Sequence, residues 1–334
     1  MAESTRIPVE DVSQTAGARR TARKMAAGIG FDSTRTEQIA IVVTEACTNI
    51  LKHAGRGEIL LNSKNEQDGG ASLEMIALDR GPGMANLEQC LVDGYSTGTS
   101  HGGGLGAIVR LSAASDFYSL SGKGSAILAR WTTSTGEERP PSMQLGVVNV
   151  SKPGQEVCGD SWGAERRDGY FAVMVADGLG HGVEARTASL EAIRMLHTNP
   201  ELSPKMLLER THRALRGTRG AAVSIARVDY ARGEVSFAGL GNVSAQIYSG
   251  SQGGQHLVSM NGTAGHNGLR LREFSYPWPA KGSLIFYSDG LLTGTGLAGY
   301  PGLDLHDPSL IAGVLYRDFS RGRDDSTVVI AKTA

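Results

Sequence analysis

The sequence has few cysteines, almost no net charge and no long apolar segment. Its three cysteines form no C-x-x-C pair, and Met1 opens a polar segment without a signal-peptide core, so we expect a reduced, cytoplasmic protein. The net charge of −1 provides no basic field for nucleic acid or an anionic membrane. No apolar run approaches the roughly 20 residues that span a bilayer. We therefore expect protein or small anionic partners, with neither nucleic acid nor membrane among them.

The length of 334 residues is sufficient for two domains that each bury a core. A polar, proline-bearing stretch, TTSTGEERPPS at 132–142, separates two halves that carry different motifs. We therefore expect a first domain at 1–135, a linker at 136–142 and a second domain at 143–334. The sequence indicates no particular oligomeric state.

The most informative stretch is FAVMVADGLGHG at 171–182. Its apolar start predicts a buried strand that ends at Asp177, with glycines directly after it. One interpretation is a hairpin, because Asp-Gly after a strand is a strong turn signal. However, aspartates recur at the borders of other apolar segments, namely Asp160, Asp289, Asp324 and Asp325. This recurrence predicts that several carboxylates share one pocket.

A pocket of carboxylates indicates a cation. Two carboxylates about 4 Å apart repel each other by a few kcal/mol at an effective dielectric constant near 20, so such a cluster needs positive charge within it. Ligands that are all oxygen atoms favour Mg²⁺ or Mn²⁺ over zinc. The sequence therefore predicts a magnesium or manganese site in the second half of the chain.

A capping box of Thr34 and Glu37 predicts the start of a helix. Polar side chains lie along one edge of this helix. Glu45, Asn49 and His53 lie at i, i+4 and i+8, so a carboxylate, an amide and an imidazole share one side of the helix. For each residue alone, a solvated helix face is the alternative. Three such residues in register beside an apolar stripe favour a functional site.

A second glycine-rich region follows a strand that ends at Asp79. Gly102, Gly104 and Gly106 precede and enter a helix predicted from Leu105. Bare backbone amides at the positive end of a helix suit a phosphate group. A flexible loop is the alternative, since the chain contains no G-x-x-x-x-G-K-[ST] sequence.

Taken in order, the motifs of the first half resemble a known family. EACTNILKH (45–53), DRGPG (79–83), GYSTG to GGGLG (94–106) and GKGS (122–125) resemble the boxes of the GHKL (Bergerat) ATP-binding fold. Within that fold they are most similar to the anti-sigma-factor serine kinases of the RsbT type, and the resemblance covers about residues 5–133. No histidine is marked as a phosphate acceptor, which disfavours a sensor histidine kinase.

This resemblance implies a role for each matching residue. Asn49 would hold Mg²⁺ on the phosphates of ATP, and Glu45 would act as general base toward a protein hydroxyl. Asp79 would accept the adenine amino group. The remaining nucleotide contacts implied by the resemblance are Gly81, Gly83, Gly102, Gly104, Gly106 and Ser125. Phosphoryl transfer needs positioned oxygens, a metal ion and a base, which agrees with this set.

The second half reads as strands with inserted helices, which predicts a layered sandwich with antiparallel strands. The ordered motifs GDSWG, VADGLGHG, RGAAVSIA, AGLGNV, FYSDGL and RDDSTVV resemble the SpoIIE branch of metal-dependent, type 2C-like serine/threonine phosphatases, in particular the RsbX type. The resemblance covers about 143–333. The expected fold class is α/β (α+β): a GHKL/Bergerat α/β sandwich followed by a PPM/SpoIIE-type α-β-β-α sandwich.

By this resemblance Asp177 bridges two metal ions and the Gly178 carbonyl binds one of them. Asp160, Asp289 and Asp324 complete the metal ligands, and Asp325 is the alternative to Asp324. His181 is either the proton donor to the leaving group or a turn residue. Water activated by the metal ions would attack phosphorus, so no nucleophilic side chain is required.

The favoured interpretation is a bifunctional protein serine/threonine kinase and phosphoserine/phosphothreonine phosphatase that uses ATP with Mg²⁺ or Mn²⁺. The resemblance implies STAS-domain antagonists or stressosome scaffold proteins as substrates. In the main alternative, the first domain is a non-catalytic, ATP-loaded module that binds a partner or regulates the phosphatase. An ATP hydrolase without a protein substrate is a further alternative. Glu45 beside Asn49 favours catalysis, because binding of ATP alone has less need of the base.

Overall fold

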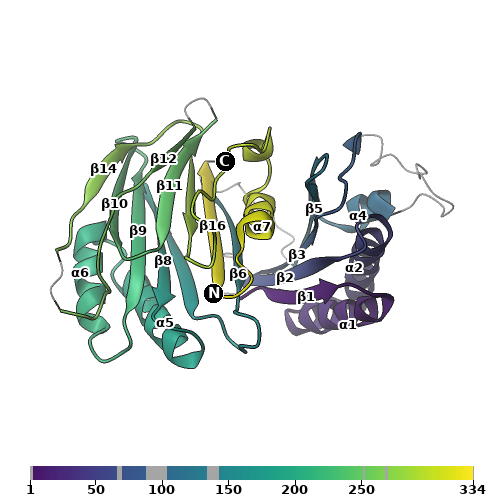
Figure 1. Cartoon of the computed structure of the whole chain (residues 1–334), viewed down its shortest axis with the longest axis horizontal. Coiled ribbons are helices and arrows are strands. Elements are labelled where there is room, and N and C mark those ends of the chain that lie inside the picture. Colours follow the sequence, from purple (N-terminus) through teal and green to yellow (C-terminus); the bar gives the residue numbers. More distant parts are fainter. Residues whose placement is uncertain are drawn as a thin grey trace. The chain divides into compact units, whose positions relative to one another are not determined.

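The computed structural model describes residues 3–65, 70–87, 104–133, 143–250, 253–267 and 270–333. The chain forms two compact units (Figure 1). The first unit contains residues 2–139 together with 305–317, and the second unit contains 140–304 and 318–334. The sequence places Leu305–Arg317 in the second domain, whereas in the structure this segment belongs to the first unit.

The first unit is built on a five-stranded sheet with the order β1-β2-β3-β5-β4, in which all pairs are antiparallel. Its strands are β1 (Thr5–Val9), β2 (Gly57–Asn65), β3 (Ala71–Asp79), β4 (Ala114–Leu120) and β5 (Gly124–Thr132). The helices that form the core on one face are α1 (Val12–Gly28), α2 (Ser33–His53) and α4 (Gly104–Leu111). Leu73, Met75 and Ala77 of β3 belong to this core, because alternate side chains of a strand share a face.

Helix α2 begins two residues earlier than the capping box of Thr34 and Glu37 predicts, and it uses a different cap. Asp32 is the N-cap residue, and its Oδ1 accepts a hydrogen bond from the backbone NH of Arg35 at 2.7 Å. The expected capping box of Thr34 and Glu37 is wrong, since Glu37 forms an ion pair with Arg23 of α1. Aspartate is a slightly better N-cap than threonine, which explains the earlier start.

The opposite face of this sheet contacts α7 (Pro308–Phe319). Ile76 and Leu78 of β3 point to this face, and Gly313 lies against them. A Cβ added at Gly313 would be 2.8 Å from Cγ2 of Ile76 and 3.3 Å from Cδ2 of Leu78. The absence of a side chain at Gly313 therefore lets the helix backbone approach the sheet closely.

We expect substitution of Gly313 by valine to destabilise the protein by about 1–3 kcal/mol, because the added atoms overpack the contact with Ile76. The matched control is Gly17→Ala in the middle of α1, where a Cβ meets no atom within 4 Å. That change should stabilise the protein by about 0.5–1 kcal/mol through helix propensity alone. Urea unfolding of both variants measures the two effects. A stabilised Gly313→Val variant would contradict the packing of α7 described above.

The second unit contains two further sheets, one of six strands and one of five. The first has the order β13-β10-β9-β8-β7, with β14 also paired to β10, and the second has the order β12-β11-β15-β16-β6. All pairs are antiparallel except β10 with β13. The strands are β6 (Met143–Val150), β7 (Asp160–Arg167), β8 (Tyr170–Gly178), β9 (Ala221–Asp229), β10 (Glu234–Leu240), β11 (Ser244–Ser249), β12 (Gly253–His256), β13 (Ser259–Met260), β14 (Phe274–Pro277), β15 (Ser283–Tyr287) and β16 (Ser326–Thr333).

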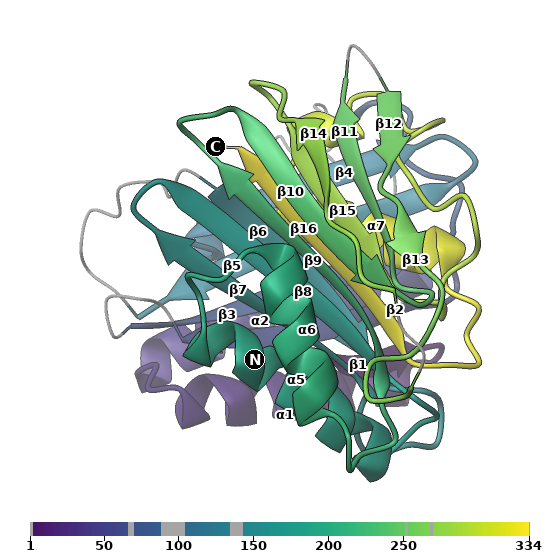
Figure 2. The same cartoon turned by 90° about the vertical axis from the view of Figure 1, so that its left-hand side faces the viewer.

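The two sheets pack face to face through an apolar core that includes Phe171, Phe237 and Phe286. Helices α5 (Val183–Thr198) and α6 (Pro204–Ala214) cover the outer face of the six-stranded sheet (Figure 2). A short 3-10 helix, η1 (Leu303–Leu305), precedes α7. The expected mixed α/β architecture with antiparallel sheets is confirmed. Of the α-β-β-α layers, the second unit supplies α5, α6 and both sheets, whereas most of α7 belongs to the first unit.

No helix of the described residues is long and apolar enough to cross a membrane.

Candidate functional site

The predicted aspartate pocket is centred on a pair of facing carboxylates. Asp160 begins β7 and lies directly opposite Asp177 of β8 in the antiparallel register. Directly opposed residues have their Cβ atoms about 4.5–5.5 Å apart on one face of the sheet. Thr327 of β16 donates a hydrogen bond to Oδ2 of Asp160 at 2.8 Å. Asp160 is therefore held between the two sheets, with Asp177 beside it.

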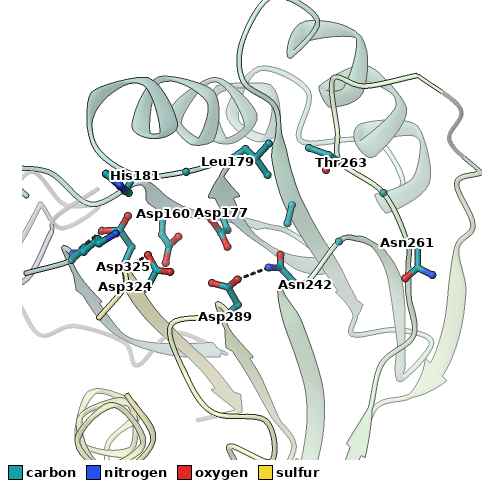
Figure 3. A pocket seen from close by; sticks show the side chains of 15 residues that line it. Asp160, Asp177, Leu179, His181, Asn242, Asn261, Thr263, Asp289, Asp324 and Asp325 are labelled. Carbon is teal, nitrogen blue, oxygen red and sulfur yellow. Dashed lines mark hydrogen bonds between the residues drawn. The ribbon is translucent and has the colours of Figure 1, made fainter. Parts of the chain in front are cut away.

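The other two predicted ligands approach from the five-stranded sheet. Asp289 follows β15 and accepts a hydrogen bond from Nδ2 of Asn242 at 2.6 Å, and Asp324 precedes β16. Figure 3 shows Asp160, Asp177, Asp289 and Asp324 pointing into one pocket, which has a volume of about 600 Å³. The structure therefore brings together the four aspartates that the resemblance implies as metal ligands.

Asp325 differs from its neighbour Asp324 in its contacts. Oδ1 of Asp325 accepts a hydrogen bond from the backbone NH of Lys152 at 2.7 Å, and Oδ2 accepts one from Gly159 at 2.9 Å. Both oxygens are thus used to tie loops together. This arrangement favours Asp324 over Asp325 as the ligand.

Three glycines shape the end of β8 and the loop after it. Gly178 packs so closely on α5 that an added Cβ would be 1.9 Å from the carbonyl oxygen of Ala185. His181 lies at the pocket edge between Gly180 and Gly182, which have φ angles of 95° and 76°. His181 is exposed, and this position fits both expectations, a turn residue and a proton donor.

The sequence interpretation did not single out several residues that line the pocket. Lys152 is one of these lining residues, and Asn242 is another, which donates a hydrogen bond to Asp289. Asn242 lies inside the AGLGNV motif, so that motif already contained the signal. Lys152 follows β6 in a loop whose sequence, SKPGQ, has no feature that distinguishes its lysine from a surface lysine.

Burial and mutual repulsion disfavour negative charge on these carboxyl groups. Burial, with added repulsion from Asp325 and Asp289, raises the pKa of Asp160 to about 7. Burial and the charge of Asp160 raise the pKa of Asp177 well above its ordinary value. Without a cation the pocket therefore retains protons near neutral pH, and a divalent cation would displace them.

The donor set suits a hydrated, hard cation. Among the residues that the structure describes, no three acidic, histidine or cysteine side chains are arranged to hold a metal ion by themselves. The pocket volume of about 600 Å³ leaves room for water or phosphate oxygens as additional ligands of a metal ion. Mg²⁺ commonly keeps several waters and binds few carboxylates, so the pocket fits this ion and Mn²⁺.

We expect the affinity for Mn²⁺ to fall by up to about tenfold for each pH unit below 7, because binding must release a proton from Asp160. Below about pH 7 the metal-free protein keeps Asp160 protonated because its pKa is raised, so the cation must displace a proton. Above about pH 7 the carboxylate is already ionised, and the affinity for Mn²⁺ no longer depends on this proton. Calorimetric titration with Mn²⁺ between about pH 5.5 and 8 measures this dependence. An affinity that is constant over this range would contradict the assignment.

A second set of predicted residues lies in the first unit, where α4 begins beside α2. A Cβ added at Gly104 would be 3.2 Å from Oδ1 of Asn49 and 3.5 Å from Oε2 of Glu45. The amide nitrogen of Asn49 is buried and has no hydrogen-bond partner among the described residues. An unpartnered buried amide beside bare backbone fits a ligand with oxygen acceptors. Gly106 lies in α4, and Gly102 is outside the described residues.

Asp79 forms the other part of this site. Its Oδ1 accepts hydrogen bonds from the backbone NH groups of Gly81 at 2.8 Å and Ser125 at 3.2 Å. Burial raises its pKa, which His53 and Arg317 partly oppose through their charge. The structure thus brings Asp79, Gly81 and Ser125 together, with His53 of α2 near enough to act on Asp79.

Gly83 has a different environment from Gly81. Its φ angle is 75°, and an added Cβ would be 2.5 Å from the carbonyl oxygen of Leu120. Packing against the hairpin between β4 and β5 therefore already explains a glycine here.

Comparison with known proteins separates the two halves of the chain. Residues 167–334 match the family Stage II sporulation protein E (SpoIIE), and residues 9–131 match the histidine kinase-like ATPase domain. The first half is similar to serine/threonine-protein kinase RsbT of Bacillus subtilis strain 168, with 32% identity over 115 residues, which are 34% of this chain and 86% of RsbT. Asp160 lies before the residues that match the SpoIIE family.

The second half is similar to phosphoserine phosphatase RsbX of the same organism, with 24% identity over 154 residues, which are 46% of this chain and 77% of RsbX. A crystal structure of RsbX in complex with magnesium aligns with a TM-score of 0.52 at 21% identity, covering 59% of this chain and 98% of that one. A chain from structural work on the bacterial stressosome aligns with a TM-score of 0.53 at 27% identity, covering 57% of this chain and 100% of that one.

Proposed function

Because the chain belongs to the SpoIIE family through its second half and to the family of the kinase RsbT through its first half, we propose that it is a bifunctional enzyme of a partner-switching pathway. Its second half is a serine phosphatase domain, and its first half is a kinase-like ATPase domain. The proposed activities are phosphorylation of a protein serine or threonine by the first unit and removal of such a phosphate by the second.

The phosphatase half rests on the pocket around Asp160 and Asp177. Together with Asp289, Asp324 and the carbonyl of Gly178, these residues would hold Mg²⁺ or Mn²⁺. Such ions polarise the phosphoryl group and activate water. The ammonium group of Lys152 would offset charge on the substrate phosphate, and the hydrogen bond from Asn242 keeps Asp289 in position.

The observation that carries the kinase half is the position of Glu45. Its carboxylate lies one helical turn before Asn49, and both face the backbone of Gly104. In the proposed reaction Glu45 takes the proton of a protein hydroxyl, the hydroxyl oxygen bonds to the γ-phosphorus of ATP, and ADP leaves. Asn49 would hold the Mg²⁺ that accompanies the phosphates. A module that only bound ATP would have less need of Glu45.

The proposed substrates are STAS-domain antagonists or stressosome scaffold proteins. Two findings support this class: the similarity to RsbT and RsbX, and the alignment with a chain from structural work on the bacterial stressosome. In the alternative function, the first unit binds ATP without transferring phosphate and instead docks a partner or regulates the phosphatase. The unpartnered amide of Asn49 supports nucleotide binding under both proposals.

Asp79→Asn tests the nucleotide site. Asp79 is proposed to contact adenine and not the phosphates, so this variant should bind Mg-ATP at least about tenfold more weakly, the effect of losing roughly 1.4 kcal/mol. Its affinity for inorganic triphosphate should change little, which provides the internal control. Isothermal titration calorimetry measures both ligands. If the unmodified protein binds no Mg-ATP, the nucleotide assignment is wrong.

A further inference from the structure

The start of α7 is fixed to the sheet of the first unit by buried charges. Glu74 of β3 is 1% exposed and accepts hydrogen bonds from Arg130 at 2.7 Å and from Ser309 at 3.2 Å. Arg130 also pairs with Asp307 at 3.0 Å. Asp116 of β4 accepts a hydrogen bond from the backbone NH of Asp307 at 2.7 Å. The start of α7 and the residue before it are therefore anchored to three strands of the ATPase unit, β3, β4 and β5.

The end of α7 reaches the proposed adenine site. Arg317 is 4% exposed, and its Nη1 donates hydrogen bonds to the carbonyl oxygens of Asp79 and Ser125, both at 3.1 Å. Arg80 in turn donates to the carbonyl oxygen of Arg317. Asp79 and Ser125 are also the residues joined by the hydrogen bond from the Ser125 backbone NH to the Asp79 carboxylate. One arginine of α7 thus supports both walls of this site.

The chain leaves α7 and enters the loops that carry the metal ligands of the second unit. Arg321 donates from its backbone NH to the carbonyl of Gly290 at 2.9 Å and from Nε to the carbonyl of Leu291 at 3.1 Å. The carbonyl of Phe319 accepts a hydrogen bond from the backbone NH of Leu292 at 2.9 Å. These contacts fix the turn after Asp289, and Asp324 follows three residues after Arg321.

We propose that α7 couples the nucleotide site to the metal centre, so that a nucleotide bound at Asp79 strengthens metal binding by the phosphatase. This inference rests on the proposed nucleotide function. A nucleotide orders Asp79 and Ser125, which fixes Arg317 and the segment that follows it. The metal ions then bind to loops that are already ordered. Metal binding therefore no longer includes the loss of conformational entropy that ordering these loops requires. The coupling must be reciprocal, so occupied metal sites also strengthen nucleotide binding by the same factor.

The test uses the full chain and hydrolysis of p-nitrophenyl phosphate at buffered concentrations of free Mn²⁺. Saturating ADP serves as the nucleotide because it has no γ-phosphoryl group to transfer. The free Mn²⁺ required for half-maximal activity should fall by about fivefold or more when ADP is present. The Arg317→Met variant should lose this shift, and Arg317→Lys, which keeps the charge without the forked contact, should reduce it.

The matched control is Arg227→Met. Arg227 also donates from Nη1 to a backbone carbonyl, that of Glu201 at 3.0 Å, and stacks over Tyr170, but it has no contact with α7 among those described. This variant should keep the full shift. An Arg317 variant that retains the shift would overturn the role of α7.

A second measurement compares the affinity for ADP of two proteins that both keep Arg317. In the same free Mn²⁺, ADP should bind the unmodified protein more tightly than it binds Asp177→Asn, by the factor seen in the activity assay. If ADP binds neither protein, the proposed nucleotide function fails. If ADP binds and the phosphatase is active, but the Mn²⁺ requirement is unchanged or raised by ADP, the coupling alone is overturned.

Discussion

Replacement of Asp177 by asparagine is expected to reduce hydrolysis of p-nitrophenyl phosphate and of a phosphoprotein on the order of 10³-fold. Asp177 faces Asp160 at the pocket and would hold a divalent cation together with it. An amide cannot supply the negative charge with which the carboxylate would hold that cation. The measurement is the steady-state rate in saturating Mn²⁺, compared with the rate in a chelator.

The matched control is Asp168→Asn in the turn that joins β7 to β8. Asp168 is exposed and belongs to the same hairpin as Asp177, so the variant should keep full activity. Circular dichroism of both variants separates loss of chemistry from loss of fold. Full activity of Asp177→Asn, or full activity of the unmodified protein in a chelator, would disprove the proposed metal centre.

Replacement of Glu45 by alanine is expected to lower the rate of phosphoryl transfer by about 10²–10⁴-fold, the usual effect of removing a general base. Binding of Mg-ATP should change little, because the carboxylate is proposed to face the acceptor hydroxyl. Asn49→Ala, by contrast, should weaken Mg-ATP binding itself. Calorimetry for binding and intact mass spectrometry of the protein substrate for transfer measure the two effects separately.

Glu37→Ala is the control for Glu45, since Glu37 lies on the same helix and pairs with Arg23. This variant should phosphorylate at the normal rate. If Glu45→Ala matches the unmodified protein with every substrate that is phosphorylated, Glu45 is not the base. The alternative, in which the first unit binds ATP without transferring it, is favoured if no candidate substrate is phosphorylated although Mg-ATP binds.

The sequence predicts the long elements of both units well, because their apolar periodicity is strong. The strand predicted to end at Asp79 coincides with β3, the buried strand predicted to end at Asp177 coincides with β8 to within one residue, and the helix predicted from Leu105 is α4. Strand β1 was not predicted. It is an edge strand that contains Pro8, and proline within a short run argues against a strand unless the strand lies at an edge. Strand β12 was also missed, since its sequence GGQH is exposed and has no apolar alternation.

The four aspartates of the metal pocket could be predicted because each borders an apolar segment. Their arrangement could not, because the pairing of Asp160 with Asp177 depends on the register of a hairpin whose first strand was not recognised. The position of α7 illustrates a second limit. Its apolar composition indicates burial, but no local pattern states which sheet will cover it. The contacts of Arg317 and Gly313 therefore appear only in the structure.

The most direct test of bifunctionality is a time course of phosphorylation on candidate STAS-domain proteins, incubated with ATP and Mn²⁺ and followed by intact mass. For a shared substrate, Asp177→Asn should accumulate more phosphoprotein than the unmodified chain, because hydrolysis is lost while transfer continues. Glu45→Ala and the double variant should accumulate almost none, and the chain with Glu45→Ala should still dephosphorylate a substrate that is supplied already phosphorylated. Two results would contradict two opposed activities on one chain. In the first, Glu45→Ala phosphorylates a candidate as fast as the unmodified chain does. In the second, the unmodified chain dephosphorylates the candidate, yet Asp177→Asn accumulates no more phosphoprotein than the unmodified chain.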